Sequence, residues 1–304
     1  MRGTLHLLPA SELPLWHAAL STSRRYRSAS WQKHFGITIE ELDRLTEAIA
    51  VALEGCVMTR EELVRKVERL AGSAAFGAKI AGSSWGTILK PAAFSGRLCF
   101  GPNLGQRVQF TRPDTWLAAA KQPLGPPIDP QAALAIITRR FLAAYGPATR
   151  HDLGRWWGGG SSISTAQRWI ASLGDEVYPV DLGGVQAWML SRHVRELKEL
   201  PPSRSVRLLP GFDQYVVAAS CHAEHLLPGD LRRRVYRPQG WISPVLLVNG
   251  RMDGTWRHEI KGSRVEVVIE SFVKTPAWVR RAAGQEAERL ATFLGCTLNL
   301  TWRI

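Results

Sequence analysis

The chain has 304 residues, 45 % of them apolar, so it is long enough for two or more domains with buried cores. Its 39 Lys and Arg residues outnumber 26 Asp and Glu residues, which gives a formal net charge of +13. This surplus favours a polyanionic partner, with nucleic acid first, although an arginine-rich solvated surface would give the same total. The four cysteines are far apart and no apolar run approaches the ~20 residues of a membrane span, which argues against a zinc ribbon, a disulfide framework or a membrane protein.

The chain begins with a segment typical of a β-strand. Polar and apolar residues alternate over residues 1–8, so that Arg2, Thr4 and His6 would share one face. That face would either contact a substrate or lie on the solvent side of a small sheet. Because a strand needs partners, we expect residues 1–56 to be the remnant of a domain followed by a linking helix.

Two further features belong to this first part. Basic and aromatic residues alternate over 23–34, which suits either phosphate and base contacts or a surface loop anchored by Tyr26 and Trp31. A capping box over 38–41 starts the linking helix, which is predicted to end at Gly55.

Residues 57–125 are predicted to form a winged helix, a variant of the helix-turn-helix. A capping box, Thr59 with Glu62, precedes three short helical periods, and the alternation over 98–110 indicates a hairpin with its turn at 102–105. In this design one helix enters a DNA groove while the wing follows the backbone. The candidate DNA-binding residues of the third helix and wing are Lys79, Lys90, Arg97, Gln106, Arg107 and Arg112.

The same order of three helices and a hairpin recurs over residues 126–192, with Arg168 on its third helix. The triple glycine at 158–160 is interpreted as a helix connector, since no Gly-Lys-Ser/Thr follows and no strand precedes it. Two such copies predict a tandem winged-helix array.

Residues 193–304 are predicted to form a β-barrel-like domain with one packed helix, which makes the whole chain α+β. Short apolar runs at 206–209, 214–219, 245–248 and 265–269 are separated by turn signals, of which Asn249-Gly250 is the strongest. Candidate DNA contacts in this domain are Arg232, Arg233, Arg251, Trp256 and Arg257. For Trp256, a position in the core is the favoured alternative.

This domain contains one candidate metal site and one candidate catalytic carboxylate. Cys221, His222 and His225 resemble part of a metal site, but too few ligands lie nearby, so we expect a polar loop and no metal or cofactor. Asp213 stands at the entry of an apolar run, where a carboxylate is either catalytic or bonded to a turn backbone, and the turn role is favoured.

Five segments, taken in order, carry a family resemblance that spans nearly the whole chain: RGTLHL at 2–7, RLCFGP at 97–102, LLPGFDQY at 208–215, YRPQGWI at 236–242 and NGRMDGTWR at 249–257. They resemble the tandem winged-helix family that includes the AlkZ-type bacterial DNA glycosylases. The resemblance implies three winged helices and a C-terminal β domain around a DNA-binding cleft. It also implies removal of alkylated bases or unhooking of interstrand crosslinks.

The chain departs from this family pattern in two places. The family's Gln-x-Gln motif, which positions the attacking water and precedes the RGTLH segment, is absent from the sequence. We therefore expect the first winged helix to be incomplete here. The Arg-rich turn that many relatives carry after the FDQY segment is replaced by Ser220-Cys221-His222.

Three functions follow as hypotheses. The first is a repair glycosylase or a degenerate relative, in which Arg2, Thr4 and His6 line the site and Asp213 stabilises a cationic sugar. The second is a non-catalytic DNA-binding regulator, and the third is a scaffold for protein contacts. The first two predict salt-sensitive binding of double-stranded DNA, damaged or intact, by a cytoplasmic monomer without membrane contact.

Overall fold

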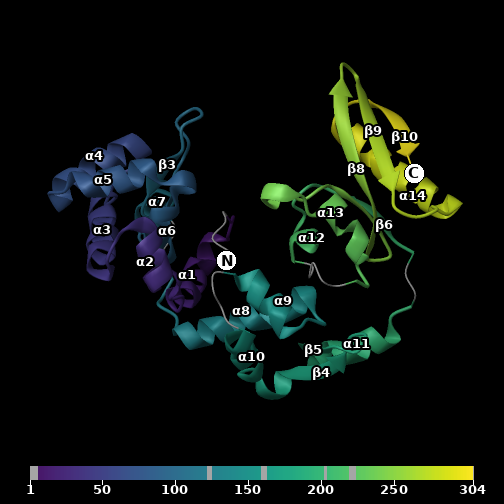
Figure 1. The fold of residues 1–304 in the computed structure, drawn as a ribbon, viewed down its shortest axis with the longest axis horizontal. Coiled ribbons are helices and arrows are strands. Elements are labelled where there is room, and N and C mark those ends of the chain that lie inside the picture. Colours follow the sequence, from purple (N-terminus) through teal and green to yellow (C-terminus); the bar gives the residue numbers. More distant parts are fainter. Residues whose placement is uncertain (1–5, 122–124, 159–162, 202–203, 219–223, 304) are drawn as a thin grey trace. The chain divides into compact units, whose positions relative to one another are not determined.

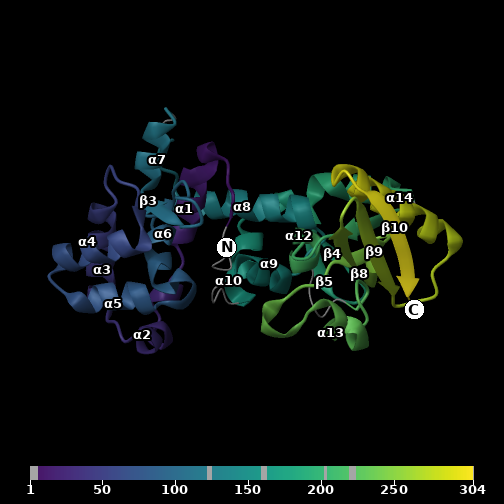
Figure 2. The ribbon, with the colours of Figure 1, turned by 90° about the horizontal axis from the view of Figure 1, so that it is seen from above.

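The computed structural model describes residues 6–121, 125–158, 163–201, 204–218 and 224–303. They form two compact units, Met1–Ser191 and Arg192–Ile304. The first unit consists of helices with short hairpins, and the second contains a sheet with one long helix (Figures 1 and 2). The α+β class is therefore confirmed. No described helix is long and apolar enough to cross a membrane.

The first half of the Met1–Ser191 unit has six α-helices and three short strands among its described residues. The helices are α1 (Leu13–Ser21), α2 (Ala29–Phe35), α3 (Ile39–Ala52), α4 (Arg60–Ala71), α5 (Ala74–Gly82) and α6 (Lys90–Phe94). The strands are β1 (Met58–Thr59), β2 (Cys99–Phe100) and β3 (Gln109–Thr111), paired in the order β1-β3-β2. The 3-10 segments are η1 (Ala10–Glu12), η2 (Arg25–Arg27) and η3 (Ser84–Leu89).

One core joins these elements from α2 to β3. Leu45 of α3, Leu63 of α4 and Ile80 of α5 are all fully buried in it. The helix expected as a linker, α3, thus shares a core with the helices that follow it. Tyr26 and Trp31 are also buried in this core, as predicted for the two rings of the stretch over 23–34. The loop expected there is wrong, since most of the stretch lies in η2 and α2.

The capping boxes form as the sequence predicts. Thr38 with Glu41 begins α3, and Thr59 with Glu62 begins α4. In each, the threonine oxygen accepts a hydrogen bond from the glutamate amide while the carboxylate accepts one from the threonine amide.

The second half of the Met1–Ser191 unit repeats the order. Its elements are α7 (Pro113–Ala119), α8 (Pro130–Tyr145), α9 (Arg150–Trp157), α10 (Ile163–Ala171), η4 (Gly174–Glu176), β4 (Val177–Asp181), β5 (Gln186–Leu190) and η5 (Ser191–His193). Strands β4 and β5 form the expected antiparallel hairpin. Before α9, Ala148 makes an isolated bridge to Trp188 of β5, as β1 pairs with β3 before α4 in the first copy.

Helix α1 belongs to the packing of the second copy. Leu15, Trp16 and Ala19 are buried against α8 and Trp157 in a core separate from that of α3 to β3. Arg140 of α8 reinforces the contact with a 2.8 Å ion pair to Glu12. The opening segment of the chain is therefore fastened to a helix far along the sequence. The strand expected over 1–8 lies mostly outside the described residues, and 6–8 are irregular.

The Arg192–Ile304 unit is an open mixed sheet, which corrects the expected β-barrel. Five strands pair in the order β10-β9-β8-β7-β6: β6 (Val206–Leu209), β7 (Val245–Val248), β8 (Arg251–Lys261), β9 (Arg264–Ser271) and β10 (Thr297–Arg303). Strand β10 is parallel to β9, and the other pairs are antiparallel. Helix α14 (Ala277–Phe293), the predicted packed helix, connects β9 to β10 and covers one face of the sheet (Figure 1).

Short helical segments complete this unit, namely α11 (Val194–Glu199), α12 (Gln214–Ala218), η6 (Gly229–Leu231), α13 (Arg232–Val235) and η7 (Pro238–Gly240). The run at 214–219 was expected to be a strand, but its described residues are the helix α12. A short apolar run fits either structure, and here the Asp213 carboxylate bonds the amide of Tyr215 and starts a helical turn.

Candidate nucleic-acid interface

The tip of the predicted first wing, the β2–β3 hairpin, is a tight turn over 104–107, two residues after the turn expected at 102–105. The Leu104 amide donates to the Arg107 carbonyl at 2.9 Å and the reverse bond is 3.0 Å, so Gly105 and Gln106 form the loop. Gly105 has φ of +62°, which favours glycine at that position. Gln106 and Arg107 are both exposed there.

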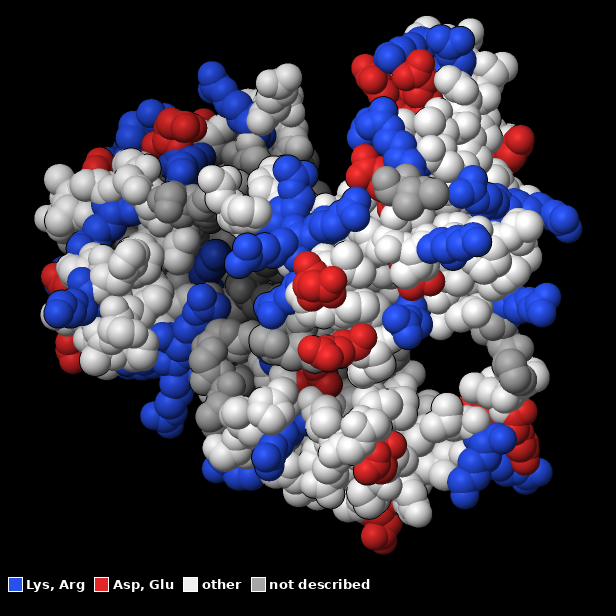
Figure 3. Space-filling model, turned by 45° about the vertical axis from the view of Figure 1, so that its right-hand side comes forward, with Lys and Arg blue, Asp and Glu red and all other residues white. Residues whose placement is uncertain are grey.

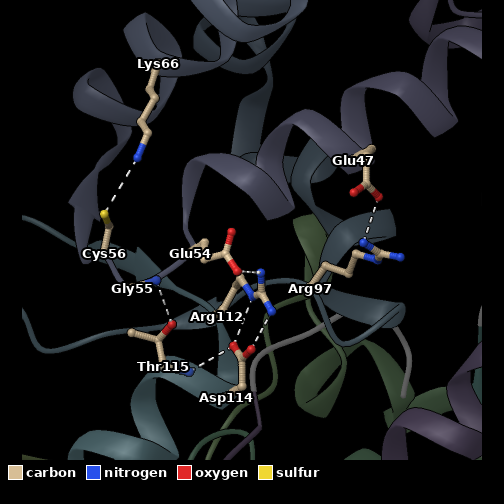
Figure 4. A network of polar contacts seen from close by, with 9 residues as sticks. All are labelled: Glu47, Glu54, Gly55, Cys56, Lys66, Arg97, Arg112, Asp114 and Thr115. Atoms are coloured by element: carbon tan, nitrogen blue, oxygen red, sulfur yellow. Dashed lines mark hydrogen bonds and ion pairs between the residues drawn. The ribbon is translucent and has the colours of Figure 1, made fainter.

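At the base of this wing, Arg112 is part of a surface ion network (Figure 4). Its guanidinium pairs with Asp114 and lies 3.5 Å from Glu54, which follows α3. Partial burial raises the pKa of Asp114, but the bonds from Arg112 and the Thr115 amide outweigh it and hold that pKa below its ordinary value. Arg112 is thus engaged in joining α3 to the start of α7.

Two other predicted cations of this region are similarly occupied. Lys79 donates from Nζ to the carbonyls of Phe35 and Gly36, at 2.9 and 2.6 Å, and so caps the carboxyl end of α2. Arg97 makes a 2.7 Å ion pair with Glu47 of α3. These contacts fix both side chains within the protein.

An open groove of about 770 Å³ in the Met1–Ser191 unit is lined by three arginines. It is lined by Thr22, Ser23, Arg24, Arg25, Ser28, Ser30, Trp157, Thr165, Arg168 and Trp169. None of these described lining residues is acidic, and hydroxyl groups stand beside three arginines. A second hollow of about 580 Å³ shares Thr22, Thr165, Arg168 and Trp169 with it and continues it along α8.

The packing of α1 on α8 builds the groove. It brings the loop after α1, which carries Arg24 and Arg25, close to α10, which carries Arg168. Arg168 bonds Thr165 at 3.2 Å, which orients its guanidinium. Lys90 of α6 lies near this loop, where burial and then the positive charge of Arg25 lower the pKa of Lys90. Like charges gathered without a counter-ion form a site for an anion such as phosphate.

Arg168 and Lys90 are among the predicted DNA contacts, whereas Arg24 and Arg25 belong to the stretch at 23–34 for which phosphate contact was only one alternative. The interleaved basic and aromatic residues at 23–34 were the available signal. The burial predicted for the two rings is confirmed, and Arg24 and Arg25 are exposed in the same segment. Their contact with phosphates or bases stays a prediction.

Three of the predicted DNA-contact residues of the Arg192–Ile304 unit have partners within the protein. Arg251 lies 3.9 Å from Asp253, and Arg257 lies 3.3 Å from Glu270. Trp256 is buried against α14 and donates from Nε1 to the Leu209 carbonyl at 2.7 Å. The core interpretation of Trp256 is therefore confirmed, and almost none of its ring surface is left for a base.

Arg232 and Arg233 lie on the short helix α13, with Arg233 exposed. On the face drawn in Figure 3, basic side chains outnumber acidic ones and the two kinds are interspersed. That face therefore has a positive bias.

The comparisons with known proteins fit this geometry. The profile of the family described as DNA glycosylase AlkZ-like matches residues 1–293. The chain belongs to the AlkZ-like family of DNA glycosylases. An interstrand DNA cross-link repair glycosylase from Streptomyces sahachiroi is 36 % identical over 298 residues, which are 97 % of this chain and 78 % of that protein.

The solved structure of Streptomyces sahachiroi DNA glycosylase AlkZ shares the fold, with a TM-score of 0.87 and 36 % identity. The match covers 99 % of this chain and 80 % of that one. The family resemblance drawn from the sequence is confirmed, and the open sheet with its packed helix is part of an AlkZ fold.

The candidate catalytic residues of this AlkZ-like chain are only partly described. Arg2 and Thr4 lie outside the described residues, and His6 is exposed at their start. Asp213 accepts a 2.8 Å hydrogen bond from the Tyr215 amide, the turn role favoured for it. Of the candidate metal cluster, Cys221 and His222 are also outside the described part, within which no group of three or more His, Cys, Asp or Glu suits a metal ion.

Proposed function

We propose that this chain binds double-stranded DNA through two winged helices and the groove of Arg24, Arg25 and Arg168. We further propose that it does so in the repair of alkylated or crosslinked bases, as a monomer in the cytoplasm. The arginine groove, whose described lining residues include no acidic residue, carries the proposal. The chain has a net charge of +13 and belongs to a family of DNA glycosylases, so the anion that it is expected to meet is the phosphate of DNA.

The winged-helix assignment is supported by the repeated order of elements. Each copy has a first helix, a short bridging segment, further helical segments and a hairpin, with the bridge paired to the hairpin's second strand. The further segments are α4, α5, η3 and α6 in the first copy and α9, α10 and η4 in the second. In such motifs one helix is inserted into the major groove and the hairpin follows the backbone. The exposed Gln106 and Arg107 are placed to contact phosphates in the first copy.

Base removal is the finer part of the proposal. A glycosylase exposes the target nucleotide and lets water attack C1′ of the sugar, so that the base leaves with the bonding electrons. Arg2, Thr4 and His6 are proposed to line that site, and Asp213 to stabilise the cationic sugar. The Asp213 oxygen that bonds the Tyr215 amide would be held in place for this role.

DNA binding without base release is the second candidate, as in a regulator. It needs only phosphate contacts such as those of the arginine groove, whose described lining residues include no acidic residue. The two candidates share their DNA contacts and differ only in product.

The test uses two duplexes, one carrying N7-methylguanine and one carrying an interstrand crosslink, each with its unmodified counterpart. Fluorescence anisotropy measures binding between 50 and 300 mM salt, roughly the range over which phosphate contacts weaken strongly. Gel analysis after heating with alkali measures base release or unhooking. Binding with product supports a glycosylase, and binding without product supports the second candidate. The absence of binding to all four duplexes would refute both.

A further inference from the structure

An exposed aromatic pair lies on the Arg192–Ile304 unit where two of the resemblance-carrying segments meet. The rings of Phe212 and Trp241 have centroids 5.5 Å apart and planes inclined by 56°. Phe212 is 47 % exposed and Trp241 58 % exposed. Large apolar side chains held together in solvent contribute little to a core, so the pair calls for another explanation.

The backbone at Phe212 is held in an unfavourable conformation. Residues 210–213 form a turn in which the Asp213 amide donates to the Pro210 carbonyl at 3.3 Å, and Phe212 has φ of +61°. That position of a turn favours glycine, yet the glycine of this segment precedes it at 211. A bulky side chain with positive φ costs conformational energy, which proteins retain mainly at functional positions.

Trp241 is presented by a loop that is closely bonded. The Arg237 amide donates to the Trp241 carbonyl at 2.8 Å, and Tyr236 bridges to Ile242 across the loop. A Cβ on Gly211 would lie 3.1 Å from the Ile242 carbonyl oxygen, so the two segments are in close contact. Both rings therefore sit on pre-organised backbone.

We propose that Phe212 and Trp241 form a stacking platform for an unpaired nucleobase of bound DNA. Aromatic side chains accept the flat face of any base, and enzymes that act on bases must receive nucleotides taken out of the stack. Arg237 and Gln239 are exposed in the same loop and offer donors for a phosphate or a base edge. This inference rests on the proposed DNA binding and adds the contact that distinguishes unpaired from paired DNA.

The experiment compares Phe212→Gly and Trp241→Ala with the parent chain. Glycine suits φ of +61°, so Phe212→Gly removes the ring while relieving the backbone, and thermal unfolding confirms that the fold is kept. Phe293→Ala is the control, because Phe293 is 87 % exposed on α14 of the same unit. The probes are a duplex with one unpaired 2-aminopurine and the same duplex fully paired, both followed by anisotropy and the first also by 2-aminopurine fluorescence.

The parent chain is expected to prefer the unpaired probe and to quench its fluorescence. Each platform variant should weaken binding of that probe by roughly 5- to 150-fold, the range that stacking on one aromatic ring gives, and restore the fluorescence. Binding of the paired duplex should stay within twofold, and Phe293→Ala should change neither. If the parent binds the paired duplex but the variants leave the preference and quenching intact, the platform is refuted while DNA binding stands. If the parent binds neither probe, both proposals fail.

Discussion

Replacing the three groove arginines should reduce the salt dependence of duplex binding by a calculable amount. Each phosphate neutralised by a cation contributes roughly 0.9 to the slope of log affinity against log salt. If Arg24, Arg25 and Arg168 each contact one phosphate, their joint replacement by Gln lowers the slope by up to ~2.7. At 0.1 M salt this corresponds to about eightfold weaker binding per contact.

Arg27 is a matched control from the same loop. Its guanidinium donates two bonds to Asp43, at 2.6 and 3.1 Å, so it is already neutralised within the protein. Arg27→Gln should therefore leave the slope nearly unchanged although it removes the same formal charge. Anisotropy titrations at four salt concentrations measure all variants. If the parent chain binds the duplex and the triple variant has the same slope as the parent, the assignment of phosphates to the groove is refuted.

Three further predictions concern single residues. Thr149→Ala removes the hydrogen-bonded cap of α9 and should lower the free energy of unfolding by about 1 kcal/mol in urea titrations. Trp256→Phe leaves the Leu209 carbonyl without its donor and should cost about 1–3 kcal/mol of stability while duplex affinity stays unchanged, whereas a loss of affinity would indicate a DNA contact. Burial and then Asp114 raise the pKa of Cys99 to about 11, so at pH 8 only ~10⁻³ of that thiol is ionised, and iodoacetamide should label it far faster after unfolding.

The features that the sequence predicted correctly are those set by neighbouring residues. The capping box of Thr59 and the tight turn at Asn249 both depend on contacts within a few residues. At the turn, Asn249 has φ of +47° and Gly250 +83°, as a two-residue hairpin requires. The family motifs extended this local information to the fold as a whole.

The features that could not be predicted depend on contacts between distant residues. Turn signals separate the strands of the second unit but do not show whether the outer strands, β6 and β10, pair to close a barrel. In the structure these two strands are at opposite edges of the sheet and are not paired. The groove likewise requires Arg25 and Arg168 to be brought together by the packing of α1 on α8. Whether Lys79 and Arg97 are available to DNA depends on their contacts with α2 and α3, and residue spacing in the sequence does not reveal these contacts.

The packing of α1 on α8 also has a consequence during synthesis on the ribosome. Helix α8 begins about 110 residues after α1 ends, and bacterial-scale elongation of roughly 5–20 residues per second makes that an interval on the order of 5–20 s. During this time Leu15 and Trp16 have none of their α8 partners, while the core from α2 to β3 lies wholly in the intervening segment. The nascent chain should therefore complete the core from α2 to β3 first and bury α1 only later, so that this apolar helix is open to chaperones in the meantime.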